Sequence, residues 1–171
     1  MRLVNFLVKK YLAARIPRIN KHFLHPVCEQ YQVLNQLVIQ LSKTSYGKKY
    51  GIQPNATYAD FRALLPICTY EELKHQISQS IAGQKDVLWP GALRWMAKSS
   101  GTTDASKYIP LTNEAIYQNH VHTGKDLMAL YYQQQPYSKV FDGKSLMIGG
   151  STAPFNNQIH AGDVSAILIQ Q

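Results

Sequence analysis

A loop rich in hydroxyl groups, set between a strand pattern and a helix pattern, constrains the fold of this 171-residue chain most. Residues 93–98 (LRWMAK) alternate apolar and polar side chains as a half-buried strand does, and helical spacing begins at about residue 112. Strand–loop–helix units are typical of α/β domains, in which such a loop lies at a strand end. We therefore expect an α/β fold: part of a parallel sheet preceded by a layer of helices.

The loop itself, residues 99–107 (SSGTTDASK), carries the chemistry that a polyphosphate requires. Hydroxyl and backbone N–H groups donate hydrogen bonds to phosphate oxygens, and a lysine ammonium neutralises charge on the β or γ phosphate. Six residues would take these roles: Ser99, Ser100, Thr102 and Thr103 as hydroxyl donors, Gly101 as the turn, and Lys107 as the cation. An ordinary solvent loop is the competing interpretation, because Ser, Thr, Gly and Asp are common turn residues.

Other site chemistries fit the sequence less well. A Walker-type loop has a second glycine before its lysine and a Ser or Thr after it, whereas Ser106 and Tyr108 stand at those positions here. The histidines and cysteines lack the spacing of metal ligands, and no G-x-S-x-G elbow is present. We assign no metal-ligating residue.

The net charge of +8 lies entirely in residues 1–50, which hold nine Lys and Arg residues against Glu29 alone. Near the start of this segment, apolar side chains recur at helical spacing with Lys9 and Lys10 among them; they are Leu3, Phe6, Leu7, Tyr11 and Ala14. We expect this helix to pack on the domain and to leave its basic face in solvent. Contact with a membrane surface or a partner is one alternative, and nucleic-acid binding, which we do not expect, is another.

The sequence also indicates a compartment. The apolar run near the N-terminus is too short for a secretory signal or a transmembrane segment. Cys28 and Cys68 lie far apart without CxxC spacing. We therefore predict a cytoplasmic protein with two reduced thiols, both buried or half-buried.

Further elements follow from periodicity and capping signals. Residues 27–42 show a helical stripe, and Thr57 and Thr69 are candidate N-caps, the second with Glu72 in a T-x-x-E capping box. A helix is expected at 113–133 and a strand at 146–148. The apolar run at 164–169 is interpreted as a sheet element that continues beyond the chain.

Five stretches resemble, in family order, the bacterial branch of the auxin-responsive Gretchen Hagen family of acyl acid amido synthetases. The core of the loop, S-G-T-T-x-x-x-K, is also similar to the adenylate-forming superfamily of acyl-coenzyme A synthetases and luciferases. The five stretches are TSYGKKYGI at 44–52, YADFRALLPICTYEELKHQI at 58–77, GQKDVLWPG at 83–91, SSGTT and SKYIPLT within 99–112, and FDGKSLMIGGS at 141–151.

The resemblance implies an ATP-dependent ligase that acts in two steps. ATP and a small carboxylic acid would form an acyl-adenylate and pyrophosphate, and an amino acid amine would then attack to give the amide. The loop would hold the β and γ phosphates together with Mg²⁺, and Lys107 would stabilise the leaving pyrophosphate. By family analogy, the helix at 113–133 is a candidate to line the acyl pocket, but we expect most of its apolar residues to pack in the core.

Family members are much longer than this chain. By resemblance, residues 1–171 form the N-terminal part of a single large domain whose C-terminal partner domain is absent, and such a piece would be inactive alone. Two other function classes compete with this reading. One is a nucleotide-binding or interaction remnant without turnover, and the other is a basic surface-binding protein that acts through residues 1–50.

Overall fold

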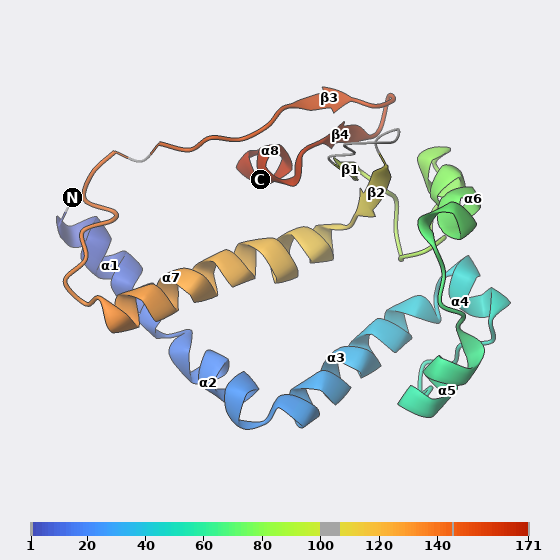
Figure 1. The fold of residues 1–171 in the computed structure, drawn as a ribbon, viewed down its shortest axis with the longest axis horizontal. Coiled ribbons are helices and arrows are strands. Elements are labelled where there is room, and N and C mark those ends of the chain that lie inside the picture. Colours follow the sequence, from blue (N-terminus) through green and yellow to red (C-terminus); the bar gives the residue numbers. More distant parts are fainter. Residues whose placement is uncertain (1, 100–106, 145, 171) are drawn as a thin grey trace. The chain divides into compact units, whose positions relative to one another are not determined.

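The structure is a computed structural model that describes residues 2–99, 107–144 and 146–170. Helices precede a small sheet, as expected from the sequence (Figure 1). In chain order the elements are α1 (Arg2–Ala13), α2 (Ile16–Leu24), α3 (Pro26–Leu41), α4 (Ser45–Lys49), α5 (Tyr58–Leu64), α6 (Tyr70–Ile81), β1 (Trp95–Lys98), β2 (Tyr108–Leu111), the π-helical η1 (Ala115–Val121), α7 (His122–Gln134), β3 (Thr152–Pro154), β4 (His160–Gly162) and α8 (Val164–Ile169).

The chain forms two compact units. One consists of α1, α2, η1 and α7, and the other consists of α3 to α6, the four strands and α8. No helix in the described part of the chain has the length and apolar character needed to cross a membrane.

In the first unit, α1 lies against α7. Leu12 and Ile19 are buried together with Ala129 and Tyr132 of α7. The Tyr132 hydroxyl donates a hydrogen bond of 3.0 Å to the buried Asn5 side-chain oxygen. This contact lets α1 bury a polar residue on the face that meets α7.

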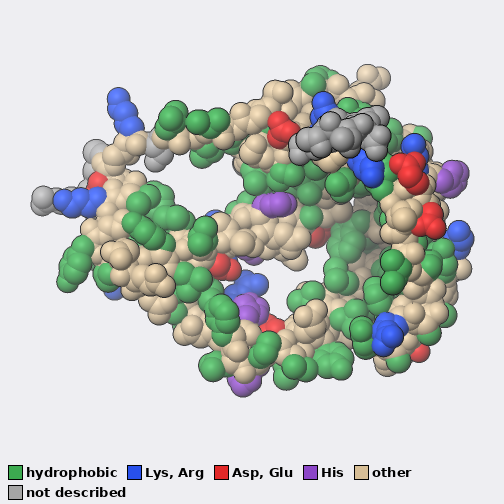
Figure 2. Space-filling model, in the orientation of Figure 1, with side chains coloured by type: hydrophobic (Ala, Val, Ile, Leu, Met, Phe, Trp, Pro, Cys, Tyr) green, Lys and Arg blue, Asp and Glu red, His purple; other side chains and the backbone are tan. Residues whose placement is uncertain are grey.

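The face of α1 that we expected to pack is instead exposed. Leu3, Phe6, Leu7 and Tyr11 are 53% to 69% exposed, and apolar side chains reach the surface here and elsewhere (Figure 2). The buried face contains Asn5 and Leu12. Hydrophobic spacing could not identify this face, because Asn5 is buried through a hydrogen bond to a residue 127 positions away.

The helical part of the second unit has its own core, formed by Val38, Ile52 and Ala56. α3 confirms the helix expected at 27–42. Thr57 and Thr69 cap α5 and α6, and in both helices the capping box is complete, with Asp60 and Glu72 as the reciprocal acceptors.

The sheet has the order β2-β1-β4-β3, so β2 and β3 are its edge strands. β1 pairs with β2 in antiparallel register and with β4 in parallel register, and β3 pairs with β4 in antiparallel register. The sheet is therefore mixed, with one parallel pair. β1 confirms the strand expected at 93–98, whereas β2 was not expected, because Pro110 within it lowers strand propensity.

Two expectations near the C-terminus are wrong. Leu146, Met147 and Ile148 are 72% to 89% exposed and lie outside the strands. The apolar run after residue 163 is helix α8, which buries Ala166 and Ile167, and not a sheet edge. Short apolar runs fit a strand or a buried helix equally well, so periodicity alone does not separate the two.

The core under the sheet contains Ile77 of α6, Met96 of β1 and Ile159. Tyr70 and Tyr108 are half-buried against it. Through these apolar contacts, α6 packs against β1 and β2, the strands that flank the hydroxyl-rich loop.

Candidate functional site

The hydroxyl-rich loop leaves β1 at Ser99 and enters β2 at Lys107. The Ser99 backbone N–H donates to the Lys107 carbonyl oxygen at 2.9 Å, and the Lys107 N–H donates to Ser99 Oγ at 3.1 Å. The two ends are thus closed together as a hairpin. Of the six predicted site residues, the structure brings these two together, while Ser100, Gly101, Thr102 and Thr103 lie outside the described residues.

Ser99 and Lys107 keep the donors that an anion needs. Ser99 is half-buried, and its oxygen accepts from the Lys107 N–H, so its hydroxyl hydrogen is still free to donate. Lys107 is exposed, and its ammonium nitrogen lies 5.5 Å from the centroid of the Tyr70 ring. The two ends of the loop therefore bring a serine hydroxyl and a lysine, which are eight positions apart in the sequence, to paired positions of the hairpin.

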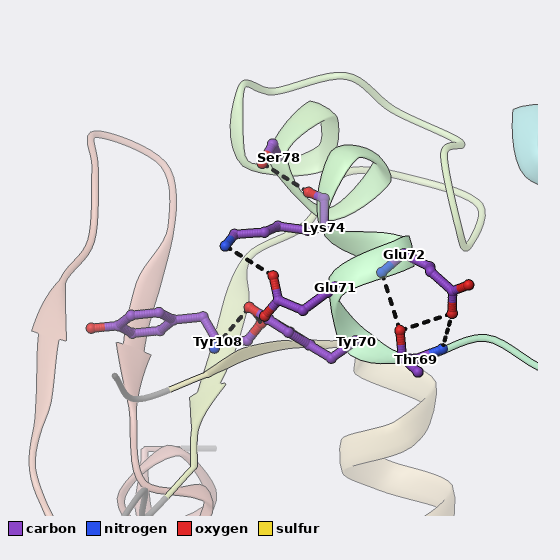
Figure 3. A network of polar contacts seen from close by, with 7 residues as sticks. All are labelled: Thr69, Tyr70, Glu71, Glu72, Lys74, Ser78 and Tyr108. Atoms are coloured by element: carbon purple, nitrogen blue, oxygen red, sulfur yellow. Dashed lines mark hydrogen bonds and ion pairs between the residues drawn. The ribbon is translucent and has the colours of Figure 1, made fainter. Parts of the chain in front are cut away.

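Tyr70, which sequence reasoning did not single out, joins α6 to the hairpin (Figure 3). Its hydroxyl donates to the Tyr108 carbonyl oxygen at 3.2 Å and accepts from the Tyr108 N–H at 3.3 Å. A pattern search would not find this residue, because the contact spans 38 positions. The available signal was its place directly after the Thr69 cap, in one of the stretches that resemble the Gretchen Hagen family.

The start of α6 is held by its capping box. The Thr69 N–H and hydroxyl donate to Glu72 Oε2 at 2.6 and 2.8 Å, and the Glu72 N–H donates back to the Thr69 hydroxyl at 3.4 Å. The backbone N–H of Thr69, together with its hydroxyl, holds the pKa of Glu72 below its usual 4.5. The helix end that carries Tyr70 is consequently well defined.

The hairpin is also anchored by its aromatic side chain. The Tyr108 and Phe155 ring centroids are 4.9 Å apart, and Tyr108 packs against the core of Ile77, Met96 and Ile159. Lys98 stands opposite Tyr108 in the β1–β2 register and is exposed. It adds a second cation near the end of the loop, which the sequence analysis did not assign.

A second feature of this unit concerns the cysteines. Cys28 is exposed, which corrects the expectation that both thiols are covered, whereas Cys68 is half-buried. The Cys68 sulfur lies 3.3 Å from the Tyr46 hydroxyl, and burial together with this neighbour raises the pKa of Tyr46. Val27 and Tyr31 at the same end of α3 are exposed as well, so this end of the helix lies outside the core around Val38.

The donor set at the hairpin fits a phosphate group. A hydroxyl and an ammonium both donate hydrogen bonds, and neither carries a negative charge that would repel an anion. Among the described residues, no three His, Cys, Asp or Glu side chains converge as a metal site would need. Chemically, the described part of the site can bind and orient a polyanion.

Comparisons with known proteins identify relatives. The model of the GH3 family N-terminal domain matches residues 15–171. Among solved structures, a "GH3.15 acyl acid amido synthetase" superposes with a TM-score of 0.69 at 21% identity, over 83% of this chain and 25% of that chain. A second, "AtGH3.15 acyl acid amido synthetase in complex with 2,4-DB", gives a TM-score of 0.70 at 21% identity, over 82% and 25%. The search of curated proteins gave no match. The chain therefore spans about a quarter of the length of these solved relatives.

Proposed function

Because the chain belongs to the GH3 family, whose N-terminal domain its residues 15–171 match, we propose that it works as part of an acyl acid amido synthetase. The proposed reaction uses ATP to activate a small carboxylic acid as an acyl-adenylate and then joins it to an amino acid. This proposal places the chain in the bacterial branch of the Gretchen Hagen family, within the adenylate-forming superfamily. The likeness to the solved amido synthetases supports the fold in which that chemistry occurs.

The hairpin that Ser99 and Lys107 close is the observation that carries this proposal. In the proposed mechanism, the Ser99 hydroxyl donates to a phosphate oxygen, and the Lys107 ammonium faces the charge that builds up on the leaving pyrophosphate. Both groups act by positioning and electrostatics and form no covalent bond. Ser100, Thr102 and Thr103 would complete the loop as further hydroxyl donors, and Gly101 would supply the turn.

Mg²⁺ would bind chiefly through the phosphate oxygens and would supply further neutralisation of their charge. No step of the proposed mechanism depends on a protein ligand for this ion. The acid and the amine are assigned by class alone. We propose a cytoplasmic location, because Cys28 and Cys68 are both free thiols, as is usual in a reducing compartment.

The family match also bears on the competing functions. A basic protein that acts through residues 1–50 would not need the loop or the sheet, yet the match extends through both to residue 171. This extent favours the synthetase over the surface-binding alternative.

Pyrophosphate exchange tests the proposal in the natural polypeptide that carries these residues. Lys107→Ala and Thr103→Ala should each lower acid-dependent exchange about 100-fold, the scale lost when one charge-stabilising donor is removed. Lys74→Ala is the matched control, because Lys74 is an exposed lysine on α6 that pairs with Glu71 at 3.1 Å. Unchanged exchange in both loop variants would overturn the assignment of the loop.

A further inference from the structure

We propose that Tyr70 is a positioning residue of the phosphate loop: its hydroxyl fixes the strand that follows the loop, and its ring holds the Lys107 ammonium. The inference rests on the proposed function, since the loop must bind phosphate for this positioning to affect catalysis. Tyr70 belongs to a different element, α6, and reaches the hairpin from outside it (Figure 3).

The role of the hydroxyl follows from the strand register. Residues 99 and 107 are joined by the Ser99 N–H bond to the Lys107 carbonyl, so the next residue, Tyr108, directs its own N–H and C=O away from β1. β2 is an edge strand, and within residues 2–99, 107–144 and 146–170 no further strand pairs with it on that side. The Tyr70 hydroxyl contacts both of these outward groups, at 3.3 Å and 3.2 Å. One side chain thus takes the place of a neighbouring strand at the residue that immediately follows Lys107.

The role of the ring concerns the lysine itself. A free lysine side chain samples many rotamers, and the loss of this conformational entropy on anion binding weakens the affinity. The Lys107 ammonium lies 5.5 Å from the Tyr70 ring centroid, within the range of a cation–π contact. This contact keeps the cation near the end of the loop before phosphate arrives.

Tyr70 is suited to this task because it is itself held in place. It is the first residue of α6, directly after the Thr69 capping box, and it is half-buried against the core of Ile77 and Met96. The same residue therefore connects a rigid helix end to both the backbone and the cation of the loop.

The experiment compares Tyr70→Phe, which removes the hydroxyl and keeps the ring, with Tyr70→Leu, which removes both. In the natural polypeptide, Tyr70→Phe should raise the KM for ATP about fivefold or more, because it removes both hydrogen bonds between the hydroxyl and Tyr108. Tyr70→Leu should raise it a further two- to fivefold through loss of the ring contact. The KM for the acid should not change in either variant, which separates positioning of the loop from general damage to the fold.

Tyr58→Leu is a matched control. Tyr58 is also the first residue of a helix with a Thr capping box, and the Arg62 guanidinium lies 5.7 Å from its ring centroid. This control should leave the KM for ATP unchanged. In a Lys107→Met background, Tyr70→Phe and Tyr70→Leu should give the same KM, because the ring then has no ammonium to hold. A persistent difference between them in that background would overturn the role of the ring.

A second readout does not depend on catalysis. Tyr70→Phe should speed amide hydrogen exchange about fivefold in peptides that cover residues 107–112, because the Tyr108 N–H loses its partner. Unchanged exchange there would overturn the positioning role, whatever the activity. The wild type could show no ATP–pyrophosphate exchange while Tyr70→Phe still speeds amide hydrogen exchange in β2. In that case the proposed function fails, but the anchoring of the hairpin by Tyr70 stands.

Discussion

Thr44 shows how one side chain organises the stretch at 44–52. It is completely buried; its hydroxyl donates to the Leu41 carbonyl at 2.7 Å and accepts from the Gly47 N–H at 2.9 Å. It therefore bonds to Leu41, the last residue of α3, and is the N-cap of α4. Only glycine fits at position 47, because a Cβ there would overlap the Leu41 carbonyl oxygen.

From this geometry we predict that Thr44→Ala destabilises the chain by about 2 kcal/mol. The substitution removes the N-cap and leaves the buried Gly47 N–H without its acceptor. Urea unfolding followed by circular dichroism measures the change. Thr44→Ser keeps the hydroxyl and should lose much less stability; equal losses in the two variants would show that the methyl group, and not the hydrogen bonds, matters.

At the scale of single residues, sequence predicted what is local. Thr57 and Thr69 were identified as caps because the partners of a cap lie within three positions. The phosphate-binding role of Ser99 and Lys107, inferred from the residue types of the loop, stays a prediction; the structure shows that two hydrogen bonds bring these residues together. The Tyr70 contact and the burial of Asn5 could not be predicted, because each depends on a partner that only the folded chain brings near.

At the scale of elements, the start of α6 depends on the charge of one carboxylate. Hydrogen bonds from the backbone N–H and the hydroxyl of Thr69 favour ionised Glu72 and lower its pKa below 4.5. A carboxyl group with a lowered folded-state pKa stabilises the fold above its unfolded pKa, and the stabilisation is lost as the pH falls through the folded value. The first turn of α6 should therefore begin to lose this stabilisation as the pH falls below 4.5, the value for an unperturbed Glu side chain.

Carboxyl NMR titration tests this prediction. Glu72 should titrate below 4.5, and Thr69→Ala should move its pKa up toward that value. The equivalent capping box of α5 is the control: Thr57→Ala should raise the pKa of Asp60, which its Thr57 bonds hold below 3.8, without moving Glu72. A Glu72 pKa that does not respond to Thr69→Ala would refute the capping-box origin of the shift.

Helices were easier to predict than strands in this chain for a physical reason. The apolar repeat of α3 and the capping residues of α5 and α6 are sequence features that lie within or directly beside each helix. β2, β3 and β4 are three or four residues long, and the parallel pair of β1 and β4 joins Trp95 to His160, 65 positions away. Four residues cannot display a reliable alternation, so the exposed segment 146–148 was mistaken for a strand and β2 was missed.

At the scale of the whole molecule, the chain spans about a quarter of the length of its solved relatives. Adenylation also requires groups that hold the adenine, the ribose and the carboxylate, and correct placement of reactants contributes about 7–11 kcal/mol to such reactions. We therefore predict that residues 1–171 alone give no measurable ATP–pyrophosphate exchange. The wild-type chain should still bind inorganic pyrophosphate. The Lys107→Ala variant should bind it more weakly, as measured by calorimetry. Acid-dependent turnover by the isolated chain would show that these residues contain a complete site.

The edges of the sheet have a consequence for how copies of the chain can associate. Both edge strands contain a proline, Pro110 in β2 and Pro154 in β3, and proline has no N–H to offer an incoming strand. On β2, the Tyr70 hydroxyl already occupies the outward peptide groups of Tyr108. Strand addition, the usual route to ordered β-aggregates, is thus blocked at the edge next to the loop. Exposed apolar side chains such as Leu3 and Phe6 can drive association, but the resulting clusters should be amorphous and should not template fibrils.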